Sequence, residues 1–225
     1  AKLSQFKATF GFNKTDTVYA TGFRSYKHHA TFTINDSEQQ FSIPMIGKHN
    51  VSNAMAAISV GHHFGESDDE IAASLASFTP TANRMEWEKG DAGEDIMSDV
   101  YNSNPTAVRA VLTSFGQIEV PQDGRRIAVL ADMLELGKSS ASLHAGLATA
   151  LDPYVINQVY LYGNEMKHLA VALKDVYPEG CVHYYDADHK EHMVDDLKND
   201  IRQNDIVVLK GSHGMHLEEV VDRLR

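Results

Sequence analysis

The chain of 225 residues has a single cysteine and no excess of positive charge, with 20 Lys and Arg residues against 31 Asp and Glu residues. One thiol, Cys181, excludes an intrachain disulfide and agrees with a reducing compartment, so we expect a cytoplasmic protein. A net charge of −11 leaves no basic stripe to neutralise phosphates. We therefore expect no nucleic acid as a partner.

Long apolar runs are also missing. No stretch approaches the roughly 20 apolar residues that span a bilayer, so we expect no membrane insertion. The first residues lack the basic and apolar segments of a signal peptide, and a strand pattern begins at once, so we expect a piece of a longer protein. What is present is an ordinary globular balance, 43% hydrophobic and 23% charged, which is enough for a core.

Residues 1–82 predict a unit rich in strands that ends in two helices. Short aromatic and β-branched runs, separated by Gly, Asn and Asp, predict strands at 6–12, 17–23, 30–34 and 39–43. Helical spacing predicts a first helix over about 50–64, with Gly65 just past its end. Ser67 and Glu70 have the spacing of a capping box, which predicts the start of a second helix.

Residues 83–225 predict an α/β fold with a doubly wound, mostly parallel, Rossmann-like sheet. Strand-like and helical runs alternate with short connections, and the runs IAVLA and IVVL are continuously apolar, as strands buried on both faces are. The expected strands are 95–99, 126–131, 158–162, 182–185 and 205–210, and the expected helices are about 105–117, 140–151, 165–176, 189–200 and 215–224. Ligands of such sheets bind beyond the carboxyl ends of the strands, which directs attention to the loops there.

The segment GKHNVSN opens the first expected helix. The spacing of His49, Asn50 and Asn53 puts polar groups on one helix face. Amide side chains offer both a donor and an acceptor, so they can bind the edge of a purine. The alternative is that Asn50 only caps the helix, and the sequence leaves both open.

The segment SDVYNSNP joins a strand to a helix. Asp99 ends the strand, Asn102 and Asn104 follow, and Pro105 stands where the helix begins. Asp99 is placed to bind a ribose hydroxyl or to organise a cation, and a helix N-terminus attracts anions. Turn chemistry with capping explains Asn104 and Pro105 without any ligand.

Two later loops have weaker or mixed signals. GKS at 137–139 resembles a phosphate loop, but the pattern requires glycine at 132, where Asp132 stands, so no phosphate loop is expected. In KGSHG at 210–214, Lys210 and a helix N-terminus suit a carboxylate, although a turn capped by Ser212 is the alternative. The twelve histidines are not spaced as a metal site.

These motifs, in this order, resemble the Mur ligase family. GKHNVSNAMAAISV is similar to the segment that closes the family's central ATPase domain, and Arg84 looks like the arginine that opens its C-terminal domain. DVYNSNP, ADMLELG and VLKGSHGMHLEEVV resemble signatures of the branch that adds D-alanyl-D-alanine. The resemblance implies that 1–82 is the C-terminal part of the ATP-binding central domain and that 83–225 is the Mur ligase C-terminal domain.

The resemblance also implies a reaction, that of an ADP-forming amide ligase of peptidoglycan precursor synthesis. ATP would phosphorylate the carboxylate of UDP-N-acetylmuramoyl tripeptide, and the amine of D-alanyl-D-alanine would attack the acyl phosphate. The implied nucleotide residues are His49, Asn50, Asn53, Arg84, Asp99 and Asn102, and the implied dipeptide residues are Asn104, Asp132, Glu135, Lys210, Ser212 and His213.

The cofactors implied are ATP and Mg²⁺, with the phosphate loop and the metal ligands upstream of this sequence. No complete catalytic set and no metal site are expected in this chain. We therefore expect the chain alone to be inactive, and we expect a monomer.

Four positions depart from the family pattern. Val100 and Ser103 replace alanines, Ala131 replaces a glycine, and His213 stands where the family has arginine, a stronger anion partner. The main rival is a phosphoacceptor or nucleotide-binding α/β module, with Asp132 and Lys210 as its aspartate and lysine. The sequence has no glycine motif of the kind that a dinucleotide-binding oxidoreductase needs. A kinase with its phosphate loop at 137–139 would need an earlier glycine that the sequence also lacks.

Overall fold

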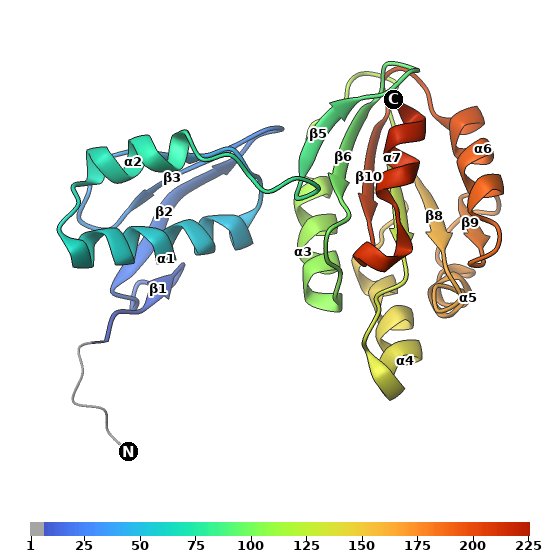
Figure 1. Ribbon diagram of the computed structural model, residues 1–225, viewed down its shortest axis with the longest axis horizontal. Helices are drawn as coiled ribbons and strands as arrows, with labels where there is room; N and C mark the ends of the chain where they lie inside the picture. The colour runs from blue at the N-terminus through green and yellow to red at the C-terminus, as the bar shows by residue number, and fades with distance from the viewer. Residues whose placement is uncertain (1–6) are drawn as a thin grey trace. The chain divides into compact units, whose positions relative to one another are not determined.

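The structure, a computed structural model, describes residues 7–225, which divide after Pro80 into two compact units. Each unit has its own sheet (Figure 1) and its own core of buried side chains. None of the helices formed by residues 7–225 has the length and apolar character needed to cross a bilayer.

The first unit packs two helices on a four-stranded sheet. Its elements are β1 (Phe10–Gly11), β2 (Val18–Ser25), β3 (Ala30–Ile34), β4 (Phe41–Ile43), α1 (Lys48–Phe64) and α2 (Asp68–Ala76). The strands lie in chain order, with β1 parallel to β2 and the other pairs antiparallel. Alternate residues of β3 are buried and form one core with α1 and α2, as a sheet covered on one face requires.

Local signals set the helix ends of this unit. Gly65 ends α1 in the left-handed conformation, at φ 86°, and the predicted capping box of Ser67 and Glu70 is confirmed. The strand predicted over 6–12 is reduced to Phe10–Gly11 within the described residues, and Phe6 lies outside them.

The second unit is an α/β domain with a six-stranded sheet in the order β5-β6-β10-β7-β8-β9. Its elements are β5 (Glu86–Lys89), β6 (Asp95–Asp99), α3 (Pro105–Gly116), β7 (Arg126–Ala131), η1 (Gly137–Ser139), α4 (Ser140–Ala145), η2 (Gly146–Ala150), β8 (Gln158–Tyr162), α5 (Lys167–Leu173), β9 (Val182–Tyr185), α6 (Lys190–Asp200), β10 (Ile206–Lys210), η3 (His213–Met215) and α7 (Glu218–Leu224). All neighbours are parallel except β5 and β6, so the predicted mostly parallel sheet is confirmed.

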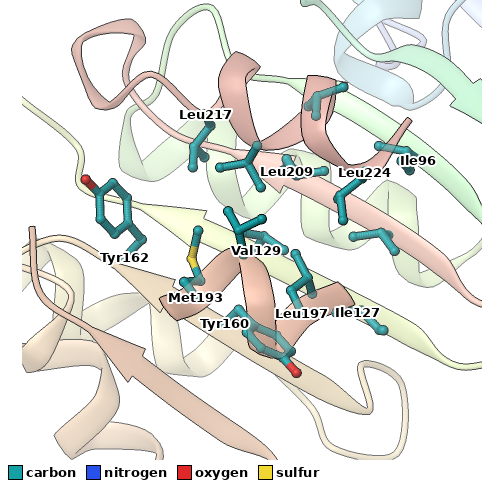
Figure 2. Packing of buried hydrophobic residues seen from close by; sticks show 14 of the residues in the cluster. Ile96, Ile127, Val129, Tyr160, Tyr162, Met193, Leu197, Leu209, Leu217 and Leu224 are labelled. Carbon is teal, nitrogen blue, oxygen red and sulfur yellow. The ribbon is translucent and has the colours of Figure 1, made fainter. Parts of the chain in front are cut away.

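Helices cover both faces of this sheet. One face packs against α6 and α7 and contributes Ile127, Val129 and Leu209 to a large apolar cluster (Figure 2). The intervening residues Ala128 and Val208 are equally buried but lie outside that cluster, because successive strand residues point to opposite faces. The buried side chains of α3, α4 and α5 are likewise outside it, which places these helices on the other face.

Three elements differ from the sequence-based expectations. The strand β5 was not predicted, because the charged run EWEK is typical of a sheet edge and not of an apolar strand. The helix expected over 140–151 is α4 followed by the 3₁₀ turn η2, where the Arg109 side chain binds the Gly146 carbonyl. The last helix starts at Glu218, after His216 adopts a left-handed conformation at φ 53°.

The order of the strands decides which loops meet. The last strand, β10, lies between β6 and β7, so the loops that follow these three strands emerge side by side. In the register of the sheet, Lys210 at the end of β10 is directly opposite Asp99 at the end of β6. Open α/β sheets bind ligands at such an edge, where the strand order reverses.

Candidate functional site

Three loops at this edge form a pocket of about 390 Å³. Its wall consists of residues 101–104 after β6, 134–136 after β7 and 212–214 after β10. Five of the residues singled out from the sequence line it, namely Asn102, Asn104, Glu135, Ser212 and His213. Three motifs that are far apart in the chain therefore share one cavity.

A buried ion pair fixes the first loop. Lys210 is 2% exposed, and its Nζ lies 2.8 Å from Asp99 Oδ2. The ammonium also donates to the carbonyl oxygens of Asn102, at 2.7 Å, and of Asp99, at 3.4 Å. An ammonium has three protons, so these acceptors satisfy it. In this structure Lys210 binds the carboxylate of Asp99 and holds the loop, where the sequence suggested a carboxylate from a ligand.

An aromatic ring links two predicted residues of the site. The guanidinium carbon of Arg84 lies 4.7 Å from the ring centroid of Tyr101, and the ring of His213 stacks on Tyr101 at 6.0 Å with 30° between the planes. Tyr101 was not among the predicted site residues. The sequence signal that could have identified Tyr101 was an aromatic residue within the loop of the SDVYNSNP motif. The Tyr101 side chain is 47% exposed in the structure.

Asp132 has a structural position beside the pocket. It is 6% exposed, and its carboxylate accepts hydrogen bonds from the backbone N–H groups of Glu165 and Met166, the latter at 2.9 Å. Burial raises the pKa of Asp132, although the two backbone hydrogen bonds and nearby His144 act in the opposite direction. Asp132 therefore ties the loop after β7 to the segment that leads into α5.

Two further side chains hold the loop after β7. The Leu134 N–H donates to Ser212 Oγ at 2.9 Å, so the Ser212 side chain joins two loops. Ser212 stands at the N-cap of η3, as the alternative reading expected, but its hydroxyl caps no helix N–H. The Met133 N–H donates to Nε2 of fully buried His144 at 2.9 Å. His144 was missed, because a lone histidine in a helical run has no distinctive sequence signal.

The raised pKa of Asp132 predicts a pH dependence that an asparagine abolishes. A carboxyl group whose pKa is raised in the folded protein lowers the free energy of unfolding as the pH increases. The decrease begins near the ordinary carboxyl pKa of 3.8 and ends above the higher pKa of the folded state. In Asp132→Asn, the amide oxygen can still accept both N–H groups but does not titrate. We expect the melting temperature of the variant, relative to wild type, to increase from pH 3.8 upward and then level off. Thermal unfolding across that range measures this, and a difference that shrinks with rising pH would contradict it.

The predicted purine-binding residues lie in the first unit. Helix α1 begins at Lys48 with Gly47 as its N-cap, so the alternative that Asn50 caps the helix is wrong. Asn50 is buried, and its side-chain amide donates to the Ile46 carbonyl at 2.9 Å. His49 is half-buried and Asn53 is exposed.

The second unit contains no phosphate-binding loop at GKS. Gly137 and Lys138 form a 3₁₀ turn that runs directly into α4, so no extended backbone is left to wrap a phosphate. Within residues 7–225, no group of three His, Cys, Asp or Glu side chains is placed to hold a metal ion.

Comparisons with known proteins identify the family of both parts of the chain. Residues 83–213 match the Mur ligase, glutamate ligase domain, and residues 1–61 match the Mur ligase middle domain. A UDP-N-acetylmuramoyl-tripeptide–D-alanyl-D-alanine ligase of Bacillus subtilis (strain 168) is 36% identical over 194 residues, which are 86% of this chain and 41% of the relative. The enzyme of the same name from Escherichia coli (strain K12) is 27% identical, over 92% of this chain and 44% of its own.

Solved structures share the fold. MurF from Acinetobacter baumannii has a TM-score of 0.80 at 24% identity, over 96% of this chain and 46% of its own. MurF ligase from Thermotoga maritima in complex with ADP has a TM-score of 0.76 at 21% identity, over 96% and 47%. The chain thus spans a little under half the length of the relatives it matches. The family match covers more than half of the residues, and the chain belongs to the Mur ligase family.

Proposed function

We propose that this chain is the C-terminal portion of an ADP-forming amide ligase that adds D-alanyl-D-alanine to UDP-N-acetylmuramoyl tripeptide in peptidoglycan synthesis. The main support is that the loops of DVYNSNP, ADMLELG and KGSHG enclose one pocket. Curated relatives that are named as this ligase align with 82–99% of the chain. In this proposal, residues 1–82 complete an ATP-binding central domain and 83–225 are the C-terminal domain of a cytoplasmic monomer.

The structure suggests two kinds of role for the proposed site residues. Asn104, Glu135 and His213 line the pocket and would contact the dipeptide, and Asn102, which would contact the nucleotide, lines the same pocket. Asp99, Asp132, Lys210 and Ser212 are held by protein partners and would position the loops. Groups fixed before the substrate arrives lower the cost of organising a charged transition state.

The proposal assigns nucleotide-binding residues to each unit separately. His49, Asn50 and Asn53 of α1 would lie near adenine, with the Asn50 amide already bound to backbone. Arg84 would contact the nucleotide from the second unit, where Tyr101 supports its guanidinium. ATP and Mg²⁺ are the cofactors of the proposed reaction, and the groups that bind phosphate and metal would come from outside this chain.

The decisive experiment joins D-alanyl-D-alanine to UDP-N-acetylmuramoyl tripeptide with ATP. It compares this chain with a full-length protein that contains it. We expect the full-length protein to form the pentapeptide product and ADP, and we expect the 225-residue chain to show no Mg²⁺-dependent ATP hydrolysis, because it lacks a phosphate loop. Turnover by the chain alone would contradict the second expectation. An inert full-length protein would refute the substrate assignment.

The phosphoacceptor alternative finds little support in the geometry. A receiver needs an accessible aspartate next to its lysine, whereas Asp132 is 6% exposed and bound to two backbone N–H groups. Lys210 is paired with Asp99 instead. Labelling with a small phosphodonor such as acetyl phosphate is expected to leave the chain unmodified.

A further inference from the structure

Ser103 has a buried hydroxyl without a partner in the wall of the pocket. Within residues 7–225, a few buried side-chain atoms have no hydrogen-bond partner, and Ser103 Oγ is one of them. The others belong to Glu94, Arg126, Tyr177 and Glu218, none of which lines this pocket. A buried polar atom without a partner is unfavourable, so its presence at a binding site requires an explanation.

The unpaired hydroxyl does not result from a loosely held loop. On one side of Ser103, the Asn102 carbonyl accepts a hydrogen bond from buried Lys210 at 2.7 Å. On the other side, Asn104 caps α3 by accepting from the Ala107 N–H at 2.9 Å. Ser103 itself is 4% exposed. The backbone is therefore fixed on both sides of a side chain that has no partner.

The surroundings of Ser103 favour an anionic ligand group. Helix α3 starts two residues later, and the positive end of its dipole lies beside the serine. His213, in the same pocket wall, carries an imidazole N–H group that can donate to an anion. Glu135, in the loop after β7, carries a negative charge. This charge suits the ammonium group of a zwitterionic ligand.

We propose that Ser103 is a specificity-determining residue that donates its hydroxyl proton to the carboxylate of the incoming dipeptide. This inference rests on the proposed function. Ser103 lines the pocket and no hydrogen bond holds its hydroxyl at one χ1 angle, so rotation about χ1 is the movement by which the oxygen would meet a ligand.

The test is steady-state kinetics of the full-length ligase with Ser103→Ala. We expect the KM for D-alanyl-D-alanine to rise about tenfold, as for loss of a hydrogen bond to a charged group, with kcat and the KM for ATP unchanged. The matched control is Ser114→Ala, which removes another buried serine hydroxyl, one that is bound to the Ala110 carbonyl within α3. The control is expected to leave all three constants unchanged.

A second substrate identifies the group that Ser103 binds. With the C-terminal amide of D-alanyl-D-alanine, which lacks the negative charge, the wild-type and Ser103→Ala enzymes are expected to have similar KM values, because the charge-assisted bond is lost in both. An equal rise of KM for dipeptide and amide would overturn the assignment to the carboxylate.

Thermal unfolding of the 225-residue chain without ligand gives a readout that does not depend on the reaction. Ser103→Ala removes an unsatisfied hydroxyl, so the melting temperature is expected to rise by about 2–4 °C, whereas Ser114→Ala does not raise it. Ligation by wild type and Ser103→Ala with equal KM overturns the role of Ser103 alone. Absence of ligation by both full-length enzymes overturns the proposed function, and the role of Ser103 with it.

Discussion

Replacing Lys210 with methionine is expected to lower the free energy of unfolding of the second unit by about 3–5 kcal/mol. The substitution keeps the apolar stem but removes the charge. It leaves the Asp99 carboxylate, whose side chain is 13% exposed, without its cation, and the Asn102 carbonyl without its donor. Trp87 is the only tryptophan of the chain and lies in β5, so its fluorescence during urea unfolding reports on this unit.

An ion pair of the same sheet whose lysine is exposed provides the control. Lys89 Nζ lies 3.0 Å from Asp95 Oδ1; the Asp95 side chain is 13% exposed, as that of Asp99 is, but the Lys89 side chain is 67% exposed. Solvent screens such a pair, so Lys89→Met is expected to change the free energy of unfolding by no more than about 1 kcal/mol. Equal effects of the two substitutions would show that burial does not determine the contribution of Lys210.

Gly163→Ala is expected to destabilise the second unit by roughly 2–5 kcal/mol, for two reasons. Gly163 has φ 115°, a conformation that residues with a Cβ rarely adopt. A Cβ at this position would also lie 2.4 Å from Cγ of Asp132, which is held in place by the backbone of Glu165 and Met166. Urea unfolding followed by Trp87 fluorescence measures the loss.

Gly180→Ala separates the two contributions. Gly180 also has a positive φ, 80°, but nothing lies within 4 Å of an added Cβ. Gly180→Ala is expected to lower the free energy of unfolding by about 1–2 kcal/mol, because only the backbone conformation is unfavourable. If Gly163→Ala lowers the free energy of unfolding by no more than Gly180→Ala does, the buried carboxylate of Asp132 can move away from an added Cβ. Asp132 would then not fix the loop.

Much of this architecture follows from local sequence. The IAVLA and IVVL runs predict strands buried on both faces, and the structure has β7 and β10 there. Ser67, Glu70 and Gly65 mark helix ends because capping requires only neighbours in sequence. The charged edge strand β5 and the division of the helix after 140 were missed, since pairing with β6 and a contact from Arg109 decide them.

The candidate site was predictable as a set of loops, but the contacts within it were not. The motifs, and their positions after predicted strands, identified Asn102, Glu135 and His213 as site residues. The reason is that ligands bind beyond the carboxyl ends of the strands of a parallel sheet. Sequence could not show that the carboxylate suited to Lys210 is that of Asp99, 111 residues earlier. Nor could it show that Ser103 is buried without a partner, since this depends on every neighbouring side chain.

By itself, the sequence determined the alternation of strands and helices, the capping box of Ser67 and Glu70, the helix end at Gly65, the family and the loops that carry polar groups. Only the tertiary structure decided that β10 inserts between β6 and β7, which brings Lys210 opposite Asp99 and places 101–104, 134–136 and 212–214 around one pocket. The reason is physical. Periodicity and capping depend on residues a few positions apart, whereas strand order and register depend on packing between segments separated by a hundred residues or more.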